Sequence, residues 1–431
     1  MPAAHDYYRS NAGEWLSRPP AVGTSDCACL VIGGGFAGLN TALGLVERGV
    51  RDVVLLEAET LGHGASGRNG GFVFAGYSRG EAALLAERGP EQARRLYART
   101  RAAVAMIRSR SQRLCIDCDR VDAGVLWVNW FRDPAVLESR RRLLAEHFDT
   151  HWQAVDREAL AASLRTSRYS AALLEADGFH FHPLKYARGL ARAIEAGGGR
   201  IHEHSAATRL VRDGAAWRVC TADGAILRAE NLVLACGGYL AGLLPRVDAA
   251  VLPIATYVMV TEPLGARAAE VMTTKAAVYD TRFAFDYYRL LPDTRLLWGG
   301  RISVRDRDPA AVRRRLRRDL LRVFPQLDGV RIDHAWSGLM SYARHEMPQI
   351  GLIEPGLWVA QAFGGHGVAP TTAAGEVLAS AIAEGDPSWR EYAPYGLVSA
   401  MKPFGFAGAQ ASYWWLQAKD AWKDWREGGH R

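Results

Sequence analysis

The chain has 431 residues, of which 49% are hydrophobic and 23% are charged. This composition supplies a sizeable core and excludes an intrinsically disordered regulator, and the length favours two or three domains. Lys and Arg outnumber Asp and Glu by 53 to 46, which gives a net charge of +7 and raises the question of an anionic partner.

The densest run of positive charge has a helical pattern. Six arginines between positions 313 and 322 are interleaved with Leu316, Leu320 and Leu321. Apolar residues at this spacing predict one buried helix face, so the arginines are expected on the solvated face. No zinc-finger spacing or aromatic-rich RNA-binding motif accompanies them. We therefore predict no nucleic-acid partner.

No membrane span, secretion signal or metal site is predicted. No segment reaches the roughly 18 consecutive apolar residues of a spanning helix, and residues 1–8 lack the charged-then-apolar plan of a signal peptide, so a cytoplasmic location is expected. Six cysteines are too few for a disulfide scaffold. The Cys115-x-x-Cys118 pair and the two His-x-His pairs, at 180–182 and 202–204, lack further ligands at a familiar spacing.

The N-terminal part of the chain predicts a β-α-β unit. Residues 28–32 form a short apolar run that leads into a glycine-rich turn, a helical pattern follows as far as Gly49, and residues 53–56 form a second apolar run. Short runs that are apolar throughout are typical of buried parallel strands. We therefore expect an α/β fold with a Rossmann-like domain.

The glycines of this unit have the spacing G-x-G-x-x-G, at Gly33, Gly35 and Gly38. The first permits a tight turn, the second lets a pyrophosphate approach the backbone, and the third lets helix and strand pack closely. Glu57, which ends the second run, can accept hydrogen bonds from an adenosine ribose and would repel the 2′-phosphate of NADP. The unit predicts dinucleotide binding, with Phe36, Ala37 and Ala58 as further contacts.

A second glycine-rich block, residues 62–71, follows where an NAD-binding domain would usually continue into a helix. Such a polar loop can bring backbone amides and a cation beside a second large group, as the isoalloxazine and ribityl chain of FAD require. The block therefore favours FAD over NAD. Its candidate contacts are Ser66, Gly67, Arg68, Asn69, Gly70 and Gly71.

Several short motifs together resemble a known family. They are Tyr7-Tyr8 near Arg18-Pro19-Pro20, the block from Gly64 to Gly71, His182-Pro183-Leu184, the segment from Asp286 to Leu290, Phe324-Pro325-Gln326-Leu327, and the segment from Gly364 to Val368. On these residues the chain resembles the FAD-dependent amine and amino-acid oxidase superfamily of the D-amino acid oxidase type, and within it the gamma-glutamylputrescine oxidase branch. The resemblance covers about residues 7 to 383.

The resemblance implies further cofactor contacts. Thr208 would supply a backbone contact to adenine, and Gly237 and Gly238 would pack beside the pyrophosphate. Arg68 stands where covalently flavinylated relatives carry a His, so the FAD is expected to be non-covalent. The segment expected to close over the pyrimidine end of the flavin is Gly364, Gly365, His366, Gly367 and Val368.

Between the glycine blocks the pattern changes. Three strand-like runs, residues 254–261, 283–291 and 295–300, predict a mostly antiparallel sheet over the flavin, with helical patterns at about 81–165 and 309–324 around it. We therefore predict an α/β fold in which a Rossmann-like FAD-binding domain is interleaved with an α+β substrate domain. The expected FAD-binding domain is 1–80, 170–248 and 332–390, the substrate domain is 81–169 and 249–331, and a Trp-rich helical tail is 391–431.

The tail contains a helical pattern at about 409–425. It carries Trp414, Trp415, Trp422 and Trp425. A C-terminal helix packed on the protein is the favoured interpretation. An interfacial membrane helix, with lysines at 419 and 423 beside the tryptophans, is the alternative.

The resemblance implies that the flavin performs the redox step. The hypothesis is that a neutral amine transfers a hydride to flavin N5, that the imine hydrolyses to an aldehyde, and that O2 is reduced to H2O2, as in polyamine catabolism. His366 is the candidate for tuning flavin N1 and O2, where negative charge develops. Aromatic residues would desolvate the ammonium group and lower its pKa, and the candidates are Tyr257, Tyr287, Tyr288 and Trp298.

Two departures from the family leave alternatives open. Met340 occupies the position where the amino-acid oxidases usually place a carboxylate-binding Arg, although Arg344 follows four residues later. An amine, polyamine conjugate or N-alkyl substrate is therefore preferred, with Met340, Arg344 and Tyr257 as substrate candidates. The run Leu296-Leu297-Trp298 lacks the Lys that some oxidases use for oxygen activation, so a dehydrogenase with another electron acceptor stays open. A flavoprotein with a biosynthetic or RNA-modifying role is the third hypothesis.

Overall fold

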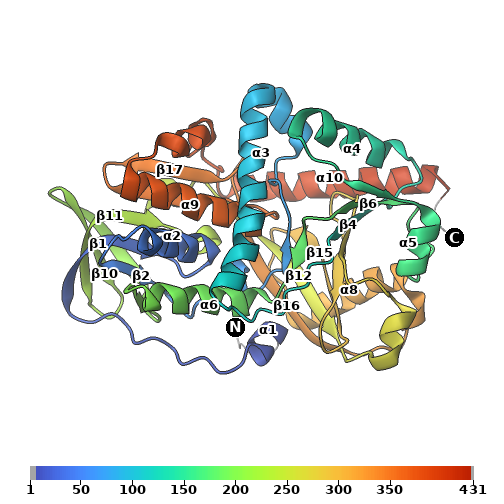
Figure 1. Cartoon of the computed structure of the whole chain (residues 1–431), viewed down its shortest axis with the longest axis horizontal. Helices are drawn as coiled ribbons and strands as arrows, with labels where there is room; N and C mark the ends of the chain where they lie inside the picture. Colours follow the sequence, from blue (N-terminus) through green and yellow to red (C-terminus); the bar gives the residue numbers. More distant parts are fainter. Residues whose placement is uncertain (1–5, 429–431) are drawn as a thin grey trace.

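Two eight-stranded sheets organise the chain in the computed structural model, which describes residues 6–428. Residues 1–5, in the segment analysed above for a secretion signal, and residues 429–431 of the predicted tail lie outside that range. In Figure 1 the first sheet lies on the left and the second on the right, and the long helix α3 (Glu81–Arg113) stands between them.

The first sheet is parallel from β18 to β8, whereas β17, β10 and β9 pair in antiparallel fashion. Its order is β17-β18-β11-β1-β2-β8, and β10 and β9 extend from β11. The predicted β-α-β unit is confirmed, because β1 pairs in parallel with both β2 and β11, and α2 follows β1 directly. The strands are β1 (Thr24–Ile32), β2 (Val53–Leu56), β8 (Arg200–His202), β9 (Ala207–Asp213), β10 (Ala216–Thr221), β11 (Ile226–Leu234), β17 (Gln349–Glu354) and β18 (Leu357–Gln361).

The second sheet is antiparallel except for one parallel pair, β4 with β13. This confirms the predicted mostly antiparallel sheet. Its order is β16-β12-β15-β14-β13-β4-β6-β5. The strands are β4 (Val125–Val128), β5 (Gln153–Val155), β6 (Ala172–Glu175), β12 (Leu252–Thr261), β13 (Ala277–Asp280), β14 (Tyr287–Leu290), β15 (Leu296–Ser303) and β16 (Ile332–Tyr342), while β3 (Phe72–Val73) and β7 (Phe179–His180) form a separate pair.

Helices surround both sheets. Buried residues of α2, α3, α6 and α9 share one apolar core, whereas α8 contributes to the core of the second sheet, and its arginines are half-buried or exposed. The helices are α1 (Tyr7–Asn11), α2 (Phe36–Glu47), α3, α4 (Ala135–Phe148), α5 (Arg157–Ser163), α6 (Pro183–Ala196), α7 (Pro245–Asp248), α8 (Pro309–Val323), α9 (Val368–Glu384) and α10 (Phe404–Arg426).

Three of the predicted domain assignments need correction. β16, placed by the sequence in the FAD-binding domain, pairs with β12 along ten positions and therefore belongs to the second sheet. β6, also placed there, pairs with β4 and β5 of the same second sheet. α3, placed in the substrate domain, packs into the core beside α2 and α9. Local patterning could not reveal these partners, because strand pairing and helix docking are set by residues far away in the sequence.

Two boundary details bear on the site. The predicted strand 283–291 is shortened to β14, because residues 281–286 form a loop before it. The predicted C-terminal helix is α10, which crosses the second half of the molecule in Figure 1.

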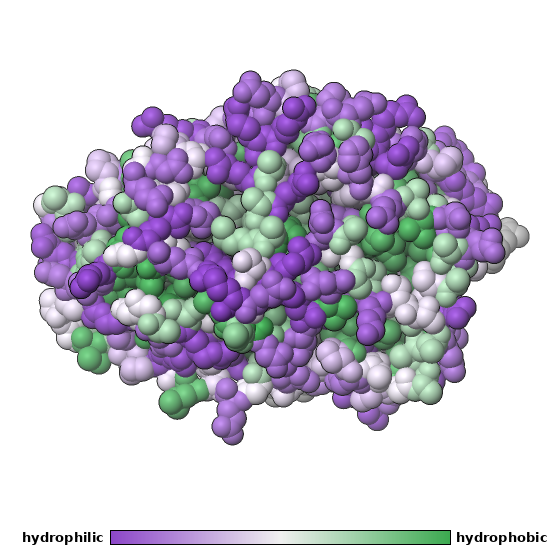
Figure 2. All heavy atoms as spheres, in the orientation of Figure 1, coloured by the Kyte–Doolittle hydropathy of each residue, from purple (hydrophilic) through white to green (hydrophobic). Residues whose placement is uncertain are grey.

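None of the helices within residues 6–428 has the length and apolarity needed to traverse a bilayer. The face drawn in Figure 2 is mostly hydrophilic, with apolar residues in small patches.

Candidate active site

A cavity of about 990 Å³ lies between the two sheets and is lined by residues of both. All four glycine clusters of the sequence reach it, although more than 300 residues separate the first from the last. The predicted cofactor residues on its wall are Gly33, Gly35, Phe36, Ala37, Glu57, Ala58, Ser66, Arg68, Asn69, Gly70, Thr208, Gly237, Gly238, Gly364, Gly365, His366, Gly367 and Val368.

The turn between β1 and α2 requires glycine at two positions. Gly33 has φ +115°, and a Cβ there would lie 2.5 Å from the carbonyl oxygen of Ala235. A Cβ on Gly38 would lie 1.9 Å from the carbonyl oxygen of Gly33. Gly38 does not line the cavity. Its missing side chain instead allows α2 to pack closely against the turn after β1.

The first turn of α2 is shaped as an anion cradle. Gly35 precedes the helix, and its missing side chain leaves the space between the helix N-terminus and Ser66 open. The Phe36 N–H donates to Ser66 Oγ at 2.8 Å, which joins the second glycine block to the first. The Gly34 N–H donates to Glu57 Oε2 at 2.7 Å. Desolvation raises the pKa of Glu57, and two backbone donors to its carboxylate oppose that shift.

The second glycine block is held in shape by Asn69. Its Nδ2 donates to the carbonyls of Ala65 and Ser66 at 3.1 and 2.9 Å, and its Oδ1 accepts from the Gly71 N–H at 2.8 Å. Arg68 lines the cavity, and its buried Nε lacks a hydrogen-bond partner within the described chain. An unpaired guanidinium N–H at a cavity wall is suited to a polar group of a bound molecule.

Arg289 ties this block to the second sheet. Its Nε donates to the carbonyl of Gly70 at 2.7 Å, and its Nη2 donates to the carbonyl of Phe181 at 2.8 Å and lies 3.1 Å from the Tyr8 hydroxyl. Three motifs that the resemblance singled out, around Tyr8, His182 and Arg289, therefore meet behind the cavity. Their role is to position the glycine block.

His366 lies two residues before the first residue of α9. Its Nε2 is 3.2 Å from the carbonyl of Phe74, which can only accept, so Nε2 carries the hydrogen. Desolvation lowers the pKa of His366 to about 4, and the ring is therefore neutral at pH 7. Its side chain has no proton left on Nδ1 to offer to a flavin oxygen. The N–H groups of Val368 and Ala369, in the first turn of α9, lack intrahelical partners and are better placed to face negative charge.

Aromatic rings form a chamber on the side of the second sheet. Phe74 is 5.2 Å from Tyr279 between ring centroids, Tyr279 is 5.7 Å from Phe285, and Phe285 is 6.2 Å from Tyr287. All four line the cavity, as does Met340. The chamber excludes water from one wall and would favour a neutral over a charged nitrogen.

A charged cluster, which the sequence did not reveal, stands at the wall beside His366. Arg140 of α4 pairs with Glu81 of α3 at 2.9 Å, and both line the cavity. Glu175 is buried behind them, and desolvation raises its pKa to about 7. Glu175 Oε2, Arg140 Nε and the Tyr279 hydroxyl lack hydrogen-bond partners within the described residues. Nothing in local patterning marks these residues, because α3, α4 and β6 meet only in the fold.

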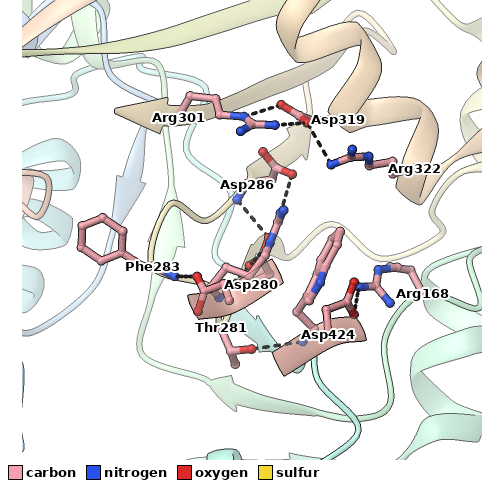
Figure 3. A network of polar contacts seen from close by, with 12 residues as sticks. Arg168, Asp280, Thr281, Phe283, Asp286, Arg301, Asp319, Arg322 and Asp424 are labelled. Carbon is pink, nitrogen blue, oxygen red and sulfur yellow. Dashed lines mark hydrogen bonds and ion pairs between the residues drawn. The ribbon is translucent and has the colours of Figure 1, made fainter. Parts of the chain in front are cut away.

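The loop 281–286 carries Phe285 of the chamber and places one further ring, Phe283, on the cavity wall. Its shape is held by Arg282, which pairs at 2.5 Å with both Asp280 and Asp286. Figure 3 shows this network, with Arg301 of the cavity wall paired to Asp319 of α8 beside it. The Phe283 N–H donates to Asp420 of α10 at 2.7 Å.

Four of the predicted catalytic or substrate residues lie away from the cavity. Tyr288 stacks on Trp298 at 4.7 Å in the core of the second sheet. Tyr257 is in the same core and donates to the Arg305 carbonyl, and Arg344 is exposed with its Nη1 3.9 Å from Met401 Sδ. Of the predicted catalytic and substrate residues, His366, Tyr287 and Met340 reach the cavity. Tyr287 and Tyr288 differ because alternate side chains of a strand face opposite sides.

Two predicted cofactor glycines are also absent from the cavity wall. A Cβ on Gly67 would lie 2.3 Å from the Gly62 carbonyl, and one on Gly71, where φ is +79°, would lie 2.2 Å from the Phe181 carbonyl. Both glycines therefore permit close backbone packing. Among residues 6–428, no three His, Cys, Asp or Glu side chains are grouped so as to hold a metal ion.

Comparisons with known proteins identify the family of this chain. The chain is 35% identical over 378 residues to gamma-glutamylputrescine oxidoreductase of Escherichia coli (strain K12), which covers 87% of this chain and 88% of that protein. It is 32% identical over 383 residues to the probable oxidoreductase OrdL of Haemophilus influenzae, with 87% of each covered. The fold is similar to that of glycine oxidase from Geobacillus kaustophilus, with a TM-score of 0.73, 20% identity, and coverage of 86% of this chain and 98% of that one.

The family model described as FAD dependent oxidoreductase matches residues 28–381. This range includes all four glycine clusters and the aromatic chamber. The resemblance drawn from the sequence is confirmed, and the chain belongs to the family of FAD-dependent oxidoreductases.

Proposed function

We propose that this protein oxidises the C–N bond of an amine of the gamma-glutamylputrescine type, with O2 as the electron acceptor. The observation that carries the proposal is the chemistry of the chamber next to the glycine clusters. Aromatic rings line it, Met340 stands on its wall, and the Glu81 carboxylate lies at one side, with the Glu175 carboxyl buried behind it. The relative from Escherichia coli, at 35% identity over most of both chains, supports the same substrate class.

The residues of the cavity fit FAD. The cradle before α2, where a side chain on Gly35 would crowd Ser66, suits a pyrophosphate, and Glu57 suits a ribose. The unpartnered Nε of Arg68 and the first turn of α9 suit the polar edge of the isoalloxazine. We propose that the cofactor is held without a covalent bond, because Arg68 stands where covalent relatives carry a His. Bound there, FAD supplies a two-electron acceptor for the C–H bond next to the amine nitrogen.

The side chains of the chamber prepare the substrate. An ammonium group that enters the cavity would meet the Glu81 carboxylate at the wall, where Glu81 is paired with Arg140. Contact with Phe74, Tyr279, Phe285 and Tyr287 would then favour loss of its proton, because desolvation disfavours the charged form. The nitrogen lone pair freed in this way assists cleavage of the neighbouring C–H bond. The proposed product is an imine that water hydrolyses to an aldehyde.

The start of α9 has an electrostatic role. The unpaired N–H groups of Val368 and Ala369 and the positive end of a 17-residue helix face the cavity. Negative charge that develops beside them on reduction would be stabilised. Neutral His366, which donates to the Phe74 carbonyl, would keep the aromatic wall in place beside this turn.

An anaerobic bleaching screen tests the proposal. The purified protein should be yellow, and gamma-glutamylputrescine should bleach the flavin in the absence of O2 at least about tenfold faster than glycine or L-proline, which is the lower end of the discrimination that a missing apolar contact provides. Unmodified putrescine serves as the matched control for the glutamyl group. Faster bleaching by the amino acids would overturn the amine assignment, and a colourless protein that binds no FAD would overturn the whole proposal.

A dehydrogenase is the second candidate. The observation that favours it is the absence of a Lys among the residues of β15, all of which the structure describes. Reoxidation distinguishes the two, because an oxidase forms one H2O2 per turnover in air, whereas a dehydrogenase reduces a dye or quinone and forms little peroxide.

A further inference from the structure

The α10 helix turns its acidic residues toward the protein. Asp420 Oδ2 accepts from the Phe283 N–H at 2.7 Å, and Asp424 forms an ion pair of 2.7 Å with Arg168. Figure 3 shows Asp424 pointing at Arg168. These contacts attach α10 to the second sheet through its polar face, and Tyr413 on the same side of the helix lines the cavity.

The opposite face of α10 is apolar and exposed. No residue of this helix is buried. Its large exposed side chains are Phe404 (77% exposed), Trp414 (66%), Trp415 (71%), Trp422 (54%) and Trp425 (75%). Four exposed alanines, at positions 407, 411, 418 and 421, fill the surface between them. A helix on a protein surface normally turns its apolar face toward the protein. In α10 the apolar face points outward instead, which indicates an apolar medium or partner on its outer side.

The charges on this outer face are all positive. Lys419 and Arg426 are exposed, and the Arg426 guanidinium lies 4.7 Å from the Trp422 ring centroid. Both carboxylates of α10, which lies entirely within the described residues, are half-buried and directed toward the protein. The outer face of α10 therefore combines tryptophans with two cations. This combination is typical of interfacial helices that lie parallel to an anionic membrane surface.

A second copy of the chain fits this face less well. The helix has 23 residues, so it is about 34 Å long, and one face about 10 Å wide offers about 340 Å². A stable protein–protein interface needs about 800 Å² from each partner. Two such faces in contact would also bring Lys419 and Arg426 of both copies together without a carboxylate to neutralise them.

We propose that the outer face of α10 binds the surface of a lipid bilayer that contains anionic headgroups. The four tryptophans lie at the level of the headgroups, and Lys419 and Arg426 contact lipid phosphates. The protein remains peripheral, attached through one helix. Because Tyr413 and Phe283 connect α10 to the cavity wall, this attachment holds one side of the active-site cavity against the membrane surface.

Vesicle flotation of the FAD-loaded protein tests the proposal. Wild-type protein should float with vesicles of phosphatidylcholine and phosphatidylglycerol and stay at the bottom with phosphatidylcholine alone. Replacing Trp414, Trp415, Trp422 and Trp425 by Ser should lower the bound fraction at least tenfold. The matched control is Leu16→Ser with Val22→Ser, which removes two side chains that are 87% and 82% exposed elsewhere, and it should float like wild type.

A charge-reversal variant that keeps all four tryptophans tests the proposal even if the tryptophan variant does not fold. Lys419→Glu with Arg426→Glu should lower binding to the anionic vesicles by at least about 25-fold, about fivefold for each cation removed. Flavin absorbance confirms that every variant is loaded. Wild-type protein that floats with neither vesicle, or tryptophan and charge variants that float like wild type, would overturn the proposal. A dimer that the tryptophan variant dissociates, without flotation of wild type, would assign the face to a second copy.

Discussion

The Arg140 guanidinium lies 2.9 Å from the Glu81 carboxylate at the wall of the cavity, with the Glu175 carboxyl buried behind the pair. Arg140 also lies over the rings of Trp127 and Trp152, with its Cζ 4.6 and 4.8 Å from their centroids. The Arg140 guanidinium therefore interacts with two carboxyl groups and two indole rings. This arrangement makes Arg140 the centre of the charged side of the cavity.

Removal of Arg140 should destabilise the protein. Arg140→Met keeps the contact with both indoles but leaves Glu81 and Glu175 without their cation, and we expect the free energy of unfolding to fall by about 3 kcal/mol. Denaturant titration of the FAD-loaded protein measures it. The control is Arg142→Met on the same helix, where the exposed pair with Glu138 contributes less than about 1 kcal/mol. Equal losses in both variants would contradict a special role for Arg140.

Gly35→Val should weaken FAD binding strongly without unfolding the protein. The φ of Gly35 is −84°, so a side chain is allowed there, but its Cβ would lie 3.0 Å from Ser66 Oγ, inside the anion cradle. We expect FAD affinity to fall by on the order of 100-fold or more, the cost of losing several backbone contacts to phosphate. Fluorescence titration of the apoprotein measures it, with Gly408→Ala as the control, since no atom crowds that position. Normal FAD content in Gly35→Val would refute the cradle.

Glu175 should make stability depend on pH. Burial raises the pKa of Glu175 to about 7, well above the value of about 4.5 of an exposed glutamate, so between these two pH values the folded state keeps a proton that the unfolded state has lost. The stability that this proton provides is complete below about pH 4.5 and is lost as pH rises to about 7, by about 3 kcal/mol in total. Glu175→Gln should lack this loss of stability. The free energy of unfolding of wild type minus that of the variant should therefore decrease between about pH 4.5 and pH 7. A difference that is flat with pH would show that Glu175 is not protonated in the folded protein.

Tyr287 and Tyr288 are neighbours in the chain with different expected roles. Tyr287→Leu should raise KM for the amine by on the order of tenfold, because the ring is part of the cavity wall. Tyr288→Leu should leave KM within about twofold but lower the free energy of unfolding by about 2 kcal/mol, since it loses the stack on Trp298. Steady-state kinetics and denaturant titration on both variants measure this. The reverse pattern would place Tyr288, and not Tyr287, at the substrate.

Much of the cofactor site was predictable from the sequence because its determinants are local. The turn between β1 and α2 needs a positive φ at Gly33 and no side chain at Gly38, and both requirements are visible as spacing within a few residues. Asn69 holds its own loop through bonds to residues two to four positions away. Such contacts are nearly independent of the rest of the fold.

The substrate side was predicted poorly because it depends on which face of a strand meets the cavity. Tyr287 and Tyr288 are indistinguishable in type, and their roles separate only when β14 pairs with β15 and turns one ring to the cavity and the next to the core. Arg344 differs from Met340 for another reason, because β16 ends at Tyr342 and Arg344 is exposed in the turn beyond it, whereas Met340 lies on the cavity wall. The alternation of side chains along a strand is visible in the sequence. Which face of the strand meets the cavity is decided by the strands and helices that pack against it, and these lie far away in the sequence.

The sequence by itself determined the cofactor class, the family and the helical nature of the tail, because short-range spacing and composition carry that information. Only the tertiary structure decided that Glu81, Arg140 and Glu175 meet beside His366, and that the tryptophans of α10 point outward. The physical reason is the same in both cases. Ion pairs and helix orientation depend on groups that are brought together by long-range packing, and the free energy of that packing belongs to the whole fold and to no single segment.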